Sequence, residues 1–299
     1  MKQLTSSGSS HHVTINQETN LFVSISSNLN TPYQAFIYKI QNQDQGLDNL
    51  KVTKLSQITS RKETDANGQV SADLNFSSML LNNALRLNME TFLMGQNATE
   101  SSIVSTMFKP PEIFNFMTPD NCKLYGMIYK PFNYVEGEKY PTLLYVYGGP
   151  HVQLVTNTYK VNKFSRLNVL SLLGYCVVVI DSRGSNNRGL AFEAYLKHCM
   201  GTVEIADQVH GIEAAAKMYN CIDMKRIGIF GWSYGGYMSL MGLAQRPDIF
   251  KVAVSGAPVT SWNLYDTAYT ERYMGLPDVN EEAYANGSVI KLVKQFPDE

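Results

Sequence analysis

The sequence predicts an α/β fold, in which a mostly parallel sheet is covered by helices on both faces and is preceded by a β-rich segment. Strand-like and helix-like segments alternate from residue 109 onward. Three of the strand-like runs are almost continuously apolar, which is typical of strands buried on both faces. By contrast, residues 1–108 are rich in Ser, Asn, Thr and Gln and contain only short alternating runs. We therefore expect two domains, residues 1–108 and residues 109–299.

The first predicted domain contains one recognisable hairpin. Residues 21–25 and 35–40 alternate apolar and polar side chains, as half-buried strands do, and the Asn-Thr-Pro-Tyr stretch between them has the composition of a turn. An isolated hairpin is only marginally stable, so this one needs further strands beside it. Residues 41–106 show little patterning. We interpret them as a polar surface insertion with a short amphipathic helix at residues 79–93.

The second predicted domain supplies the alternation that defines the fold class. The expected strands span residues 124–129, 142–147, 175–180, 227–231 and 252–255. The expected helices span residues 161–173, 203–219 and 236–246. No internal repeat of 20–50 residues is visible, which argues against a solenoid for the chain as a whole.

Composition and charge exclude several classes of function. Of the 299 residues, 44% are hydrophobic and 17% are charged, and the formal net charge is −1. These values suit a globular protein and indicate no nucleic-acid partner and no membrane partner. No apolar run approaches the length of a membrane span. The four cysteines are scattered without metal-ligand spacing, so we expect free thiols, no metal site and no cofactor.

The most informative stretch is Gly231-Trp-Ser-Tyr-Gly235, which fits the pattern G-x-S-x-G. In an α/β-hydrolase this pattern forms a tight turn between a strand and a helix, with the serine hydroxyl exposed at its tip. The expected strand before it and the expected helix after it supply that context. We therefore predict that Ser233 is a nucleophile and that the backbone N–H of Tyr234 donates to the developing oxyanion.

A nucleophilic serine needs a histidine to take its proton and a carboxylate to orient that histidine. In α/β-hydrolases the order along the chain is serine, acid, histidine. Every histidine here precedes Ser233, and the five are His11, His12, His151, His198 and His210. His151 breaks the expected order, and we interpret it as a loop or packing residue. No candidate strand leads to an acid after residues 252–255, so the acid is missing as well.

The resemblance of this chain to a known family rests on several motifs. They are Gly231–Tyr237, Ala257–Asp266, Tyr269–Gly275, Val146–Pro150, Asp181–Gly184 and the stretch from Pro110 to Pro131. Together they are similar to the prolyl oligopeptidase family, in its dipeptidyl peptidase IV branch. The last of these stretches is most similar to the cytosolic dipeptidyl peptidases of that branch. The resemblance is strong over residues 109–299. Residues 1–45 more weakly resemble the last blade of the family's eight-bladed propeller.

The resemblance implies a partial α/β-hydrolase domain preceded by a propeller fragment. It implies that Tyr147 donates its hydroxyl to the oxyanion together with the Tyr234 amide. A phenol is a suitable donor because it stays protonated at neutral pH. The resemblance also implies a small apolar pocket for proline or alanine, since aromatic faces suit a flat ring. The residues that match this pocket are Val259, Trp262, Tyr265 and Tyr269.

By the same resemblance, the substrate is a peptide with Pro or Ala at its second position, cleaved through a serine acyl-enzyme. The location is expected to be cytoplasmic, and a longer form is expected to be a homodimer. The family's triad aspartate and histidine would follow residue 299, and most of the propeller would precede residue 1. We therefore expect the chain to be part of a longer enzyme and to be inactive alone.

Two alternatives stay open at this point. The first is a non-catalytic protein that keeps the hydrolase fold for binding, which the absent histidine favours. The intact G-x-S-x-G pattern argues against it, because a binding module has no need of Ser233. The second is a lipase or esterase of the same fold, which the Trp-Ser-Tyr core and the residues 269–275 disfavour.

Overall fold

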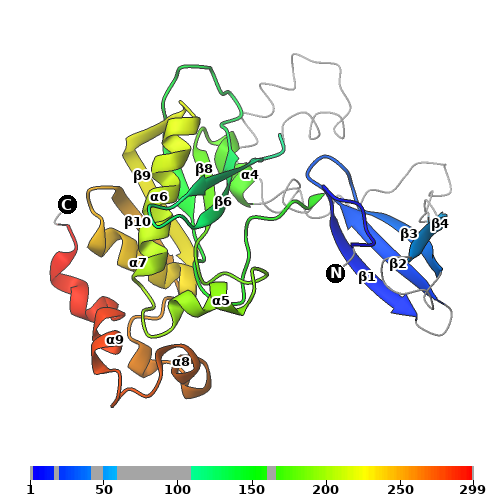
Figure 1. Ribbon diagram of the computed structural model, residues 1–299. Coiled ribbons are helices and arrows are strands. Elements are labelled where there is room, and N and C mark those ends of the chain that lie inside the picture. The colour runs from blue at the N-terminus through cyan, green and yellow to red at the C-terminus, as the bar shows by residue number, and fades with distance from the viewer. Residues whose placement is uncertain (1–2, 17–19, 42–49, 59–108, 160–165, 298–299) are drawn as a thin grey trace, which may run out of the picture. The chain divides into compact units, whose positions relative to one another are not determined.

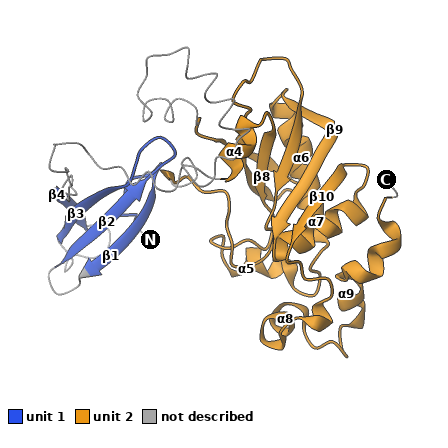
Figure 2. Cartoon of the chain, turned by 180° about the vertical axis from the view of Figure 1, so that it is seen from behind, with its two compact units in different colours: residues 1–108 blue, residues 109–299 orange. Residues whose placement is uncertain are grey.

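The computed structural model describes residues 3–16, 20–41, 50–58, 109–159 and 166–297 of the chain (Figure 1). The chain divides into two compact units, residues 1–108 and residues 109–299, which Figure 2 distinguishes by colour. Each unit has its own sheet. Within the described ranges, no helix combines the length and the apolar composition that a membrane span requires.

The first unit contains a four-stranded antiparallel sheet in which neighbours along the chain are neighbours in the sheet. Its strands are β1 (Ser10–Asn16), β2 (Leu21–Ser27), β3 (Gln34–Gln41) and β4 (Lys51–Ile58). The predicted hairpin is confirmed by the antiparallel pairing of β2 with β3. Phe22 and Tyr38 stack across this pair with their ring centroids 4.8 Å apart. A sheet of four antiparallel strands in this order is consistent with a propeller blade.

The prediction of an unpatterned insertion over residues 41–106 is wrong at β4, which pairs with β3 along its length. This strand is polar and carries two lysines, as exposed edge strands often do, so it lacks the alternation that reveals a strand in sequence. Its Lys54 ammonium lies 3.3 Å from the ring centroid of Phe36. The predicted helix at residues 79–93 lies outside the described residues.

The second unit is built on a six-stranded sheet of order β10-β9-β7-β8-β6-β5. The strands β10, β9, β7 and β8 run parallel, and β6 and β5 add antiparallel neighbours at one side. Their bounds are β5 (Glu112–Met117), β6 (Lys123–Tyr129), β7 (Tyr140–Tyr145), β8 (Cys176–Asp181), β9 (Ile222–Trp232) and β10 (Phe250–Gly256). The five predicted strands are confirmed, and β5 was not predicted.

Helices follow the strands in the predicted alternation. Their bounds are α4 (Arg166–Leu172), α5 (Leu190–Glu193), η5 (Ala194–Leu196), α6 (Val203–Met218), α7 (Tyr234–Gln245), η6 (Trp262–Leu264), α8 (Thr267–Met274), α9 (Glu281–Asn286) and η7 (Val289–Gln295). The three predicted helices correspond to α4, α6 and α7, although residues 161–165 of the helix expected at 161–173 lie outside the described residues. The short elements after β10 were not predicted.

The central strand β8 shows how the sheet is covered. All of its side chains from Cys176 to Ile180 are fully buried. Successive side chains point to opposite faces, so Val177 and Val179 pack in a cluster with Leu167 of α4. Cys176, Val178 and Ile180 belong to the larger core cluster, to which α6 and α7 contribute. Helices therefore cover both faces, as the apolar strand pattern predicted.

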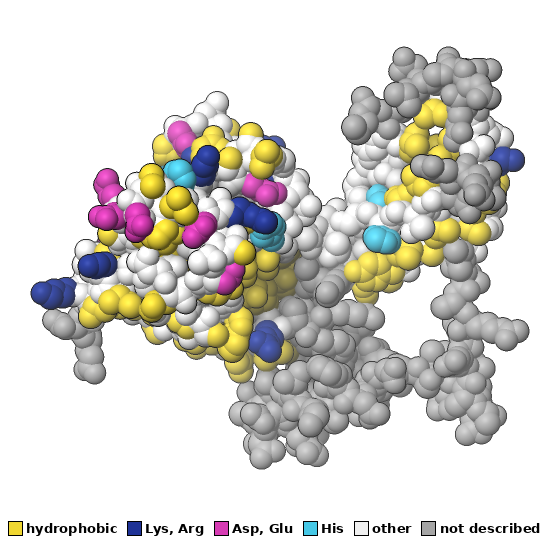
Figure 3. All heavy atoms as spheres, turned by 90° about the horizontal axis from the view of Figure 1, so that it is seen from below, with side chains coloured by type: hydrophobic (Ala, Val, Ile, Leu, Met, Phe, Trp, Pro, Cys, Tyr) yellow, Lys and Arg dark blue, Asp and Glu magenta, His cyan; other side chains and the backbone are white. Residues whose placement is uncertain are grey.

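The surface carries charges of both signs. Figure 3 shows one face of the molecule, on which acidic, basic and apolar side chains are interspersed over the second unit. This mixture agrees with the formal net charge of −1. A large field of one sign, of the kind that attracts a polyanion, is not seen on that face.

Candidate functional site

The site begins where β9 ends and α7 begins. Ser233 joins the two elements with a φ of 56° and a ψ of −116°. This left-handed conformation is strained for a residue with a side chain, and such strain is concentrated at functional sites. Two backbone hydrogen bonds hold it. The Ser233 N–H donates to the Gly256 carbonyl at 2.9 Å, and the Ser233 carbonyl accepts from the Tyr237 N–H at 3.0 Å.

The glycines beside Ser233 are required by close backbone packing. A methyl group on Gly231 would lie 2.3 Å from the Val146 carbonyl oxygen, and one on Gly235 would lie 2.1 Å from the same atom. One on Gly236 would lie 2.5 Å from the Gly256 carbonyl oxygen. The ends of β7 and β10 thus press against the turn. The two outer glycines of the pattern are needed because backbone, which cannot rotate away, fills the space.

We expect Gly235→Ala to destabilise the second unit by about 1–3 kcal/mol, because the added methyl group forces α7 away from the end of β7. The free energy of unfolding in urea measures the loss. The matched control is Gly242→Ala in the same helix, where the nearest atoms belong to the side chains of Ile229 and Phe250 at 3.1 Å or more. Equal stabilities of the two variants would contradict this account of the turn.

The predicted oxyanion donors lie beside the turn. Tyr147 follows the end of β7 by two residues and is partly exposed. Its ring centroid lies 5.9 Å from that of Tyr234, with the rings tilted by 32°. Burial raises the pKa of Tyr147, with a further contribution from Tyr265 and Tyr273, so the hydroxyl is a neutral donor at neutral pH. The structure thus brings Tyr147 and Tyr234 together at one end of the sheet.

The aromatic residues that match the proline pocket form a cluster against Tyr234. Trp262 packs on Tyr234 at 5.5 Å between ring centroids and stacks on Tyr269 at 6.1 Å. Tyr265 lies across the edges of both Trp262 and Tyr269. Only 1% of Trp262 is exposed, whereas 44% of Tyr265 is. Trp262 therefore backs the cluster, and Tyr265 and Tyr269 present its accessible surface.

Val259, the remaining residue of the predicted pocket, is partly buried and packs against the main core cluster. Tyr273 was not singled out from the sequence, yet its ring centroid lies 5.0 Å from that of Tyr269. Its place one turn after Tyr269 in α8 is the pattern that could have revealed it.

None of the five histidines is hydrogen bonded to Ser233 in the structure. His151 bonds through a ring nitrogen to the Tyr273 hydroxyl, and its carbonyl accepts from the Asn186 side chain at 2.9 Å. This agrees with the interpretation of His151 as a loop and packing residue. His210 lies on α6, and His11 bonds to the Ser24 hydroxyl of the first unit at 2.9 Å. His198 precedes α6, where its N–H donates to the Tyr273 carbonyl at 2.8 Å.

Two acids hold a loop and a turn in place, and they are Asp181 at the end of β8 and Asp207 in α6. Asp181 accepts the backbone N–H of Leu154 and of Val155, both at 2.9 Å. Asp207 of α6 is fully buried and accepts from the Arg183 backbone and guanidinium at 2.7–3.2 Å. These contacts give both acids a structural role, in which Asp181 holds the loop at residues 154–155 and Asp207 holds the turn after β8.

We expect Asp181 to give the protein a specific pH dependence of stability. Burial raises the pKa of Asp181 to about 6, against the lowering effect of the two backbone hydrogen bonds. In the unfolded chain an aspartate titrates near 3.9, at about the ordinary value. The folded protein holds this proton more tightly. The contribution of Asp181 to the free energy of unfolding is therefore present below pH 4 and is lost as pH rises to about 6.

Urea unfolding at a series of pH values, compared between the natural chain and Asp181→Asn, measures this contribution. The expected difference curve falls between about pH 4 and pH 6 and is flat above. Asp223→Asn is the control, because the hydrogen bond from Arg226 holds the pKa of Asp223 below its ordinary value and so reverses the sign of the difference. Parallel curves for the natural chain and Asp181→Asn would refute the prediction.

One further residue at the site escaped the sequence-based prediction. Glu204 is fully buried, and its carboxylate accepts the Tyr234 hydroxyl hydrogen bond at 2.6 Å. It is the second residue of α6. An acid in the first turn of a helix is common because it complements the helix dipole, so the pattern alone gave no reason to single it out.

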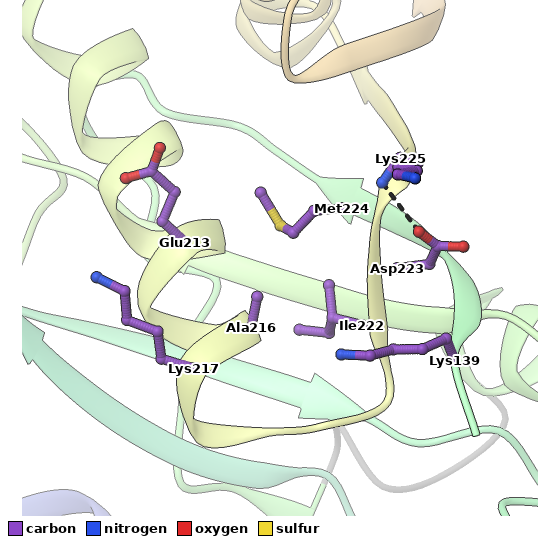
Figure 4. Close-up of a pocket in the computed structure, with 8 residues that line it drawn as sticks. All are labelled: Lys139, Glu213, Ala216, Lys217, Ile222, Asp223, Met224 and Lys225. Carbon is purple, nitrogen blue, oxygen red and sulfur yellow. Dashed lines mark hydrogen bonds between the residues drawn. The ribbon is translucent and has the colours of Figure 1, made fainter. Parts of the chain in front are cut away.

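Two cavities among the described residues lie away from Ser233. The larger, of about 640 Å³, is lined by residues of α6 and by the first residues of β9 (Figure 4). Ile222 at the start of β9 lines it, whereas Ser233 follows the other end of that strand. At about 3.3 Å per residue the strand separates the two by on the order of 30 Å. Among the described residues, no three His, Cys, Asp or Glu side chains gather as a metal site would require.

A strained serine between the end of a buried parallel strand and a helix defines the α/β-hydrolase class. Comparison with known proteins narrows this class. The sequence profile of the prolyl oligopeptidase family matches residues 161–297. The chain belongs to that family.

Three relatives give the extent of the similarity. Dipeptidyl peptidase 8 of Mus musculus is 58% identical over 192 residues, which are 64% of this chain and 22% of the relative. Dipeptidyl peptidase 8 of Homo sapiens is 58% identical over the same length, which is 21% of that protein. Prolyl endopeptidase FAP of Homo sapiens is 35% identical over 215 residues, 71% of this chain and 28% of the relative. The matched part of the chain thus spans 21% to 28% of the length of these three relatives.

Proposed function

We propose that the chain carries the nucleophile of a serine dipeptidyl peptidase, which removes dipeptides from the N-termini of peptides with Pro or Ala at the second position. The observation that carries the proposal is the strained Ser233 with Tyr147 and Tyr234 beside it. The names of the relatives, two of which are dipeptidyl peptidases, support the reaction type. The aromatic cluster of Trp262, Tyr265 and Tyr269 supports a small apolar pocket for a proline ring.

The proposed chemistry follows from the positions of these groups. The Ser233 hydroxyl oxygen attacks the carbonyl carbon of the scissile peptide bond while a base takes its proton. The carbonyl oxygen becomes an oxyanion, which accepts from the Tyr147 hydroxyl and the Tyr234 N–H. Collapse expels the amine with a proton and leaves the dipeptide as an ester on Ser233. Water then hydrolyses this ester and regenerates the serine.

The base is the missing part of this proposal. The chain's histidines are not hydrogen bonded to Ser233, and the bonds found for His151 engage Tyr273 and Asn186 instead. We propose that a histidine and a carboxylate from outside these 299 residues complete the site and that the chain alone does not turn over. A cytoplasmic location and a homodimer belong to the same proposal, which the resemblance to cytosolic dipeptidyl peptidases supports.

The test uses two proteins. One is the 299-residue chain. The other is a chimera, namely human dipeptidyl peptidase 8 in which the segment that aligns with this chain is replaced by the sequence of this chain. We expect the chimera, and not the chain, to release a fluorophore from Gly-Pro substrates and to be labelled at Ser233 by a fluorophosphonate. A chimera that folds but ignores both reagents would instead favour the non-catalytic binding protein. Preference for short esters over Gly-Pro would favour an esterase.

We expect Tyr147→Phe in the chimera to lower kcat by about 10²–10³-fold with little change in KM, the effect of removing one oxyanion donor. The control is Tyr145→Phe, because Tyr145 ends β7 and packs on Phe230 with ring centroids 5.1 Å apart, away from Tyr234. Steady-state kinetics on Gly-Pro substrates give both constants. Equal kcat values for the two variants would remove Tyr147 from the proposed mechanism.

A further inference from the structure

The second residue of α6 is a glutamate that the proposed chemistry leaves unused. Glu204 has no exposed surface, and no ion pair among the described residues involves it. Its carboxylate is satisfied by neutral donors instead. It accepts the Gly201 N–H at 2.7 Å and the Thr202 N–H at 3.0 Å. A buried carboxylate without a cation is costly, so its persistence in a core calls for a reason.

The third donor to Glu204 is the hydroxyl of Tyr234, at 2.6 Å. This is the shortest of the three contacts and the only one made by a side chain. It joins α6 to the first residue of α7, directly after Ser233. Burial raises the pKa of Glu204, while the hydrogen bond from Tyr234 lowers it. Charge-assisted hydrogen bonds of this kind are about twice as strong as neutral ones, so the carboxylate is a firm anchor for the phenol.

The aromatic ring of Tyr234 packs against the loop that carries Tyr147, the other proposed oxyanion donor. A methyl group on Gly149 would lie 2.5 Å from Cγ of Tyr234, so the Gly149 backbone rests on the ring face. Tyr147 lies on the same ring at 5.9 Å between centroids. The Tyr234 side chain is therefore a spacer, fixed by Glu204 at one end and touching the Tyr147 loop along its face.

We propose that Glu204 is a positioning residue for the oxyanion hole. By holding the Tyr234 hydroxyl, it fixes the backbone N–H of Tyr234 and, through the Tyr234 ring, the loop of Tyr147 and Gly149. The positions of both oxyanion donors, Tyr147 and Tyr234, thus depend on one buried carboxylate in α6. The inference rests on the proposed function, because it assigns a role to Glu204 only in the reaction at Ser233.

Three variants separate this role from general support of the core. Glu204→Gln keeps the shape of the side chain but turns an N–H group toward the N–H of Gly201 or Thr202. Tyr234→Phe removes only the hydroxyl and serves if Glu204→Gln fails to fold. The matched control is Tyr237→Phe, which removes another buried hydroxyl from α7. The Tyr237 hydroxyl donates to the Met200 carbonyl at 3.2 Å and not to Glu204.

The kinetic arm uses the chimera with dipeptidyl peptidase 8 and Gly-Pro substrates. A small displacement of an oriented group costs up to about a hundredfold in rate, so we expect Glu204→Gln and Tyr234→Phe each to lower kcat by about 10–100-fold. KM stays within about twofold, and the double variant is no slower than the slower single variant, because one variant weakens and the other removes the same contact between Glu204 and the Tyr234 hydroxyl. Tyr237→Phe keeps kcat near that of the parent. An unchanged kcat for folded Tyr234→Phe, in which the contact with Glu204 is removed outright, would overturn the proposal.

The second arm uses the 299-residue chain and needs no turnover. Hydrogen–deuterium exchange is compared for peptides that cover residues 231–238 and residues 146–150. We expect faster exchange in both peptides for Glu204→Gln and Tyr234→Phe, and unchanged exchange for Tyr237→Phe. If the parent chimera is inactive, the proposed function fails and this arm alone decides. Unchanged exchange in both peptides would then overturn the positioning role.

Discussion

Ser233→Ala in the chimera is expected to lower kcat on Gly-Pro substrates on the order of a millionfold, the scale of loss when a serine peptidase loses its nucleophile. The alanine has no oxygen to form the acyl-enzyme, and the remaining donors cannot replace covalent chemistry. Active-site labelling with a fluorophosphonate, followed by mass spectrometry of the labelled peptide, is expected to find no adduct on the variant.

The matched control is Ser239→Ala, which removes a buried hydroxyl from the same helix. Ser239 donates to the Gly235 carbonyl at 2.7 Å and has no part in the proposed reaction, so kcat is expected to change little. Residual turnover of Ser233→Ala near the parent value would place the chemistry elsewhere. Unfolding midpoints of both variants show whether any loss of rate reflects loss of folded protein.

Asp207→Ala is expected to lower the free energy of unfolding by about 3–5 kcal/mol, because it removes the buried partner of a buried arginine and leaves only the exposed Asp120 to pair with it. Asp207 is fully buried and Arg183 is 6% exposed, and three hydrogen bonds join the guanidinium to this carboxylate. The neighbouring Asp120 raises the pKa of Arg183 less than Asp207 does. Urea unfolding measures the loss.

The comparison variant is Asp248→Ala, which removes an aspartate from an exposed pair with Arg246. An exposed pair contributes at most about 1 kcal/mol, so this variant is expected to be nearly as stable as the natural chain. Replacing Asp207 and Arg183 together by apolar residues of similar size is expected to recover part of the loss, because no unpaired charge remains. A loss below about 1 kcal/mol for Asp207→Ala would contradict the prediction, because Asp120 or water would then compensate the charge of Arg183.

The predicted parts of the site were those that depend on local sequence. The turn at Ser233 is local, because its glycines and the apolar strand before it are neighbours along the chain. Tyr147, Tyr234 and the aromatic residues after β10 were recognised as motifs, and the structure brings them together around one ring cluster. Their catalytic and binding roles remain proposals.

The parts that escaped prediction depend on contacts between distant segments. The segment β4 forms a strand because its backbone pairs with the edge of β3, whereas its polar residues by themselves resemble a loop. In the sequence Glu204 resembles any acid in the first turn of a helix. Its role depends on the hydrogen bond from Tyr234 of α7, which only the folded structure shows. Tyr273 likewise meets His151 only after α8 folds against the loop beyond β7.

The amino-acid sequence by itself determined the class of this protein: alternating strands and helices, apolar strands buried on both faces, and a serine between glycines where a strand meets a helix. These features are local, and periodicity and turn chemistry record them directly. Only the tertiary structure decided why those glycines are required and which buried group anchors Tyr234. Both answers lie in close approaches of segments far apart in the chain, namely β7 and α6 against the first turn of α7.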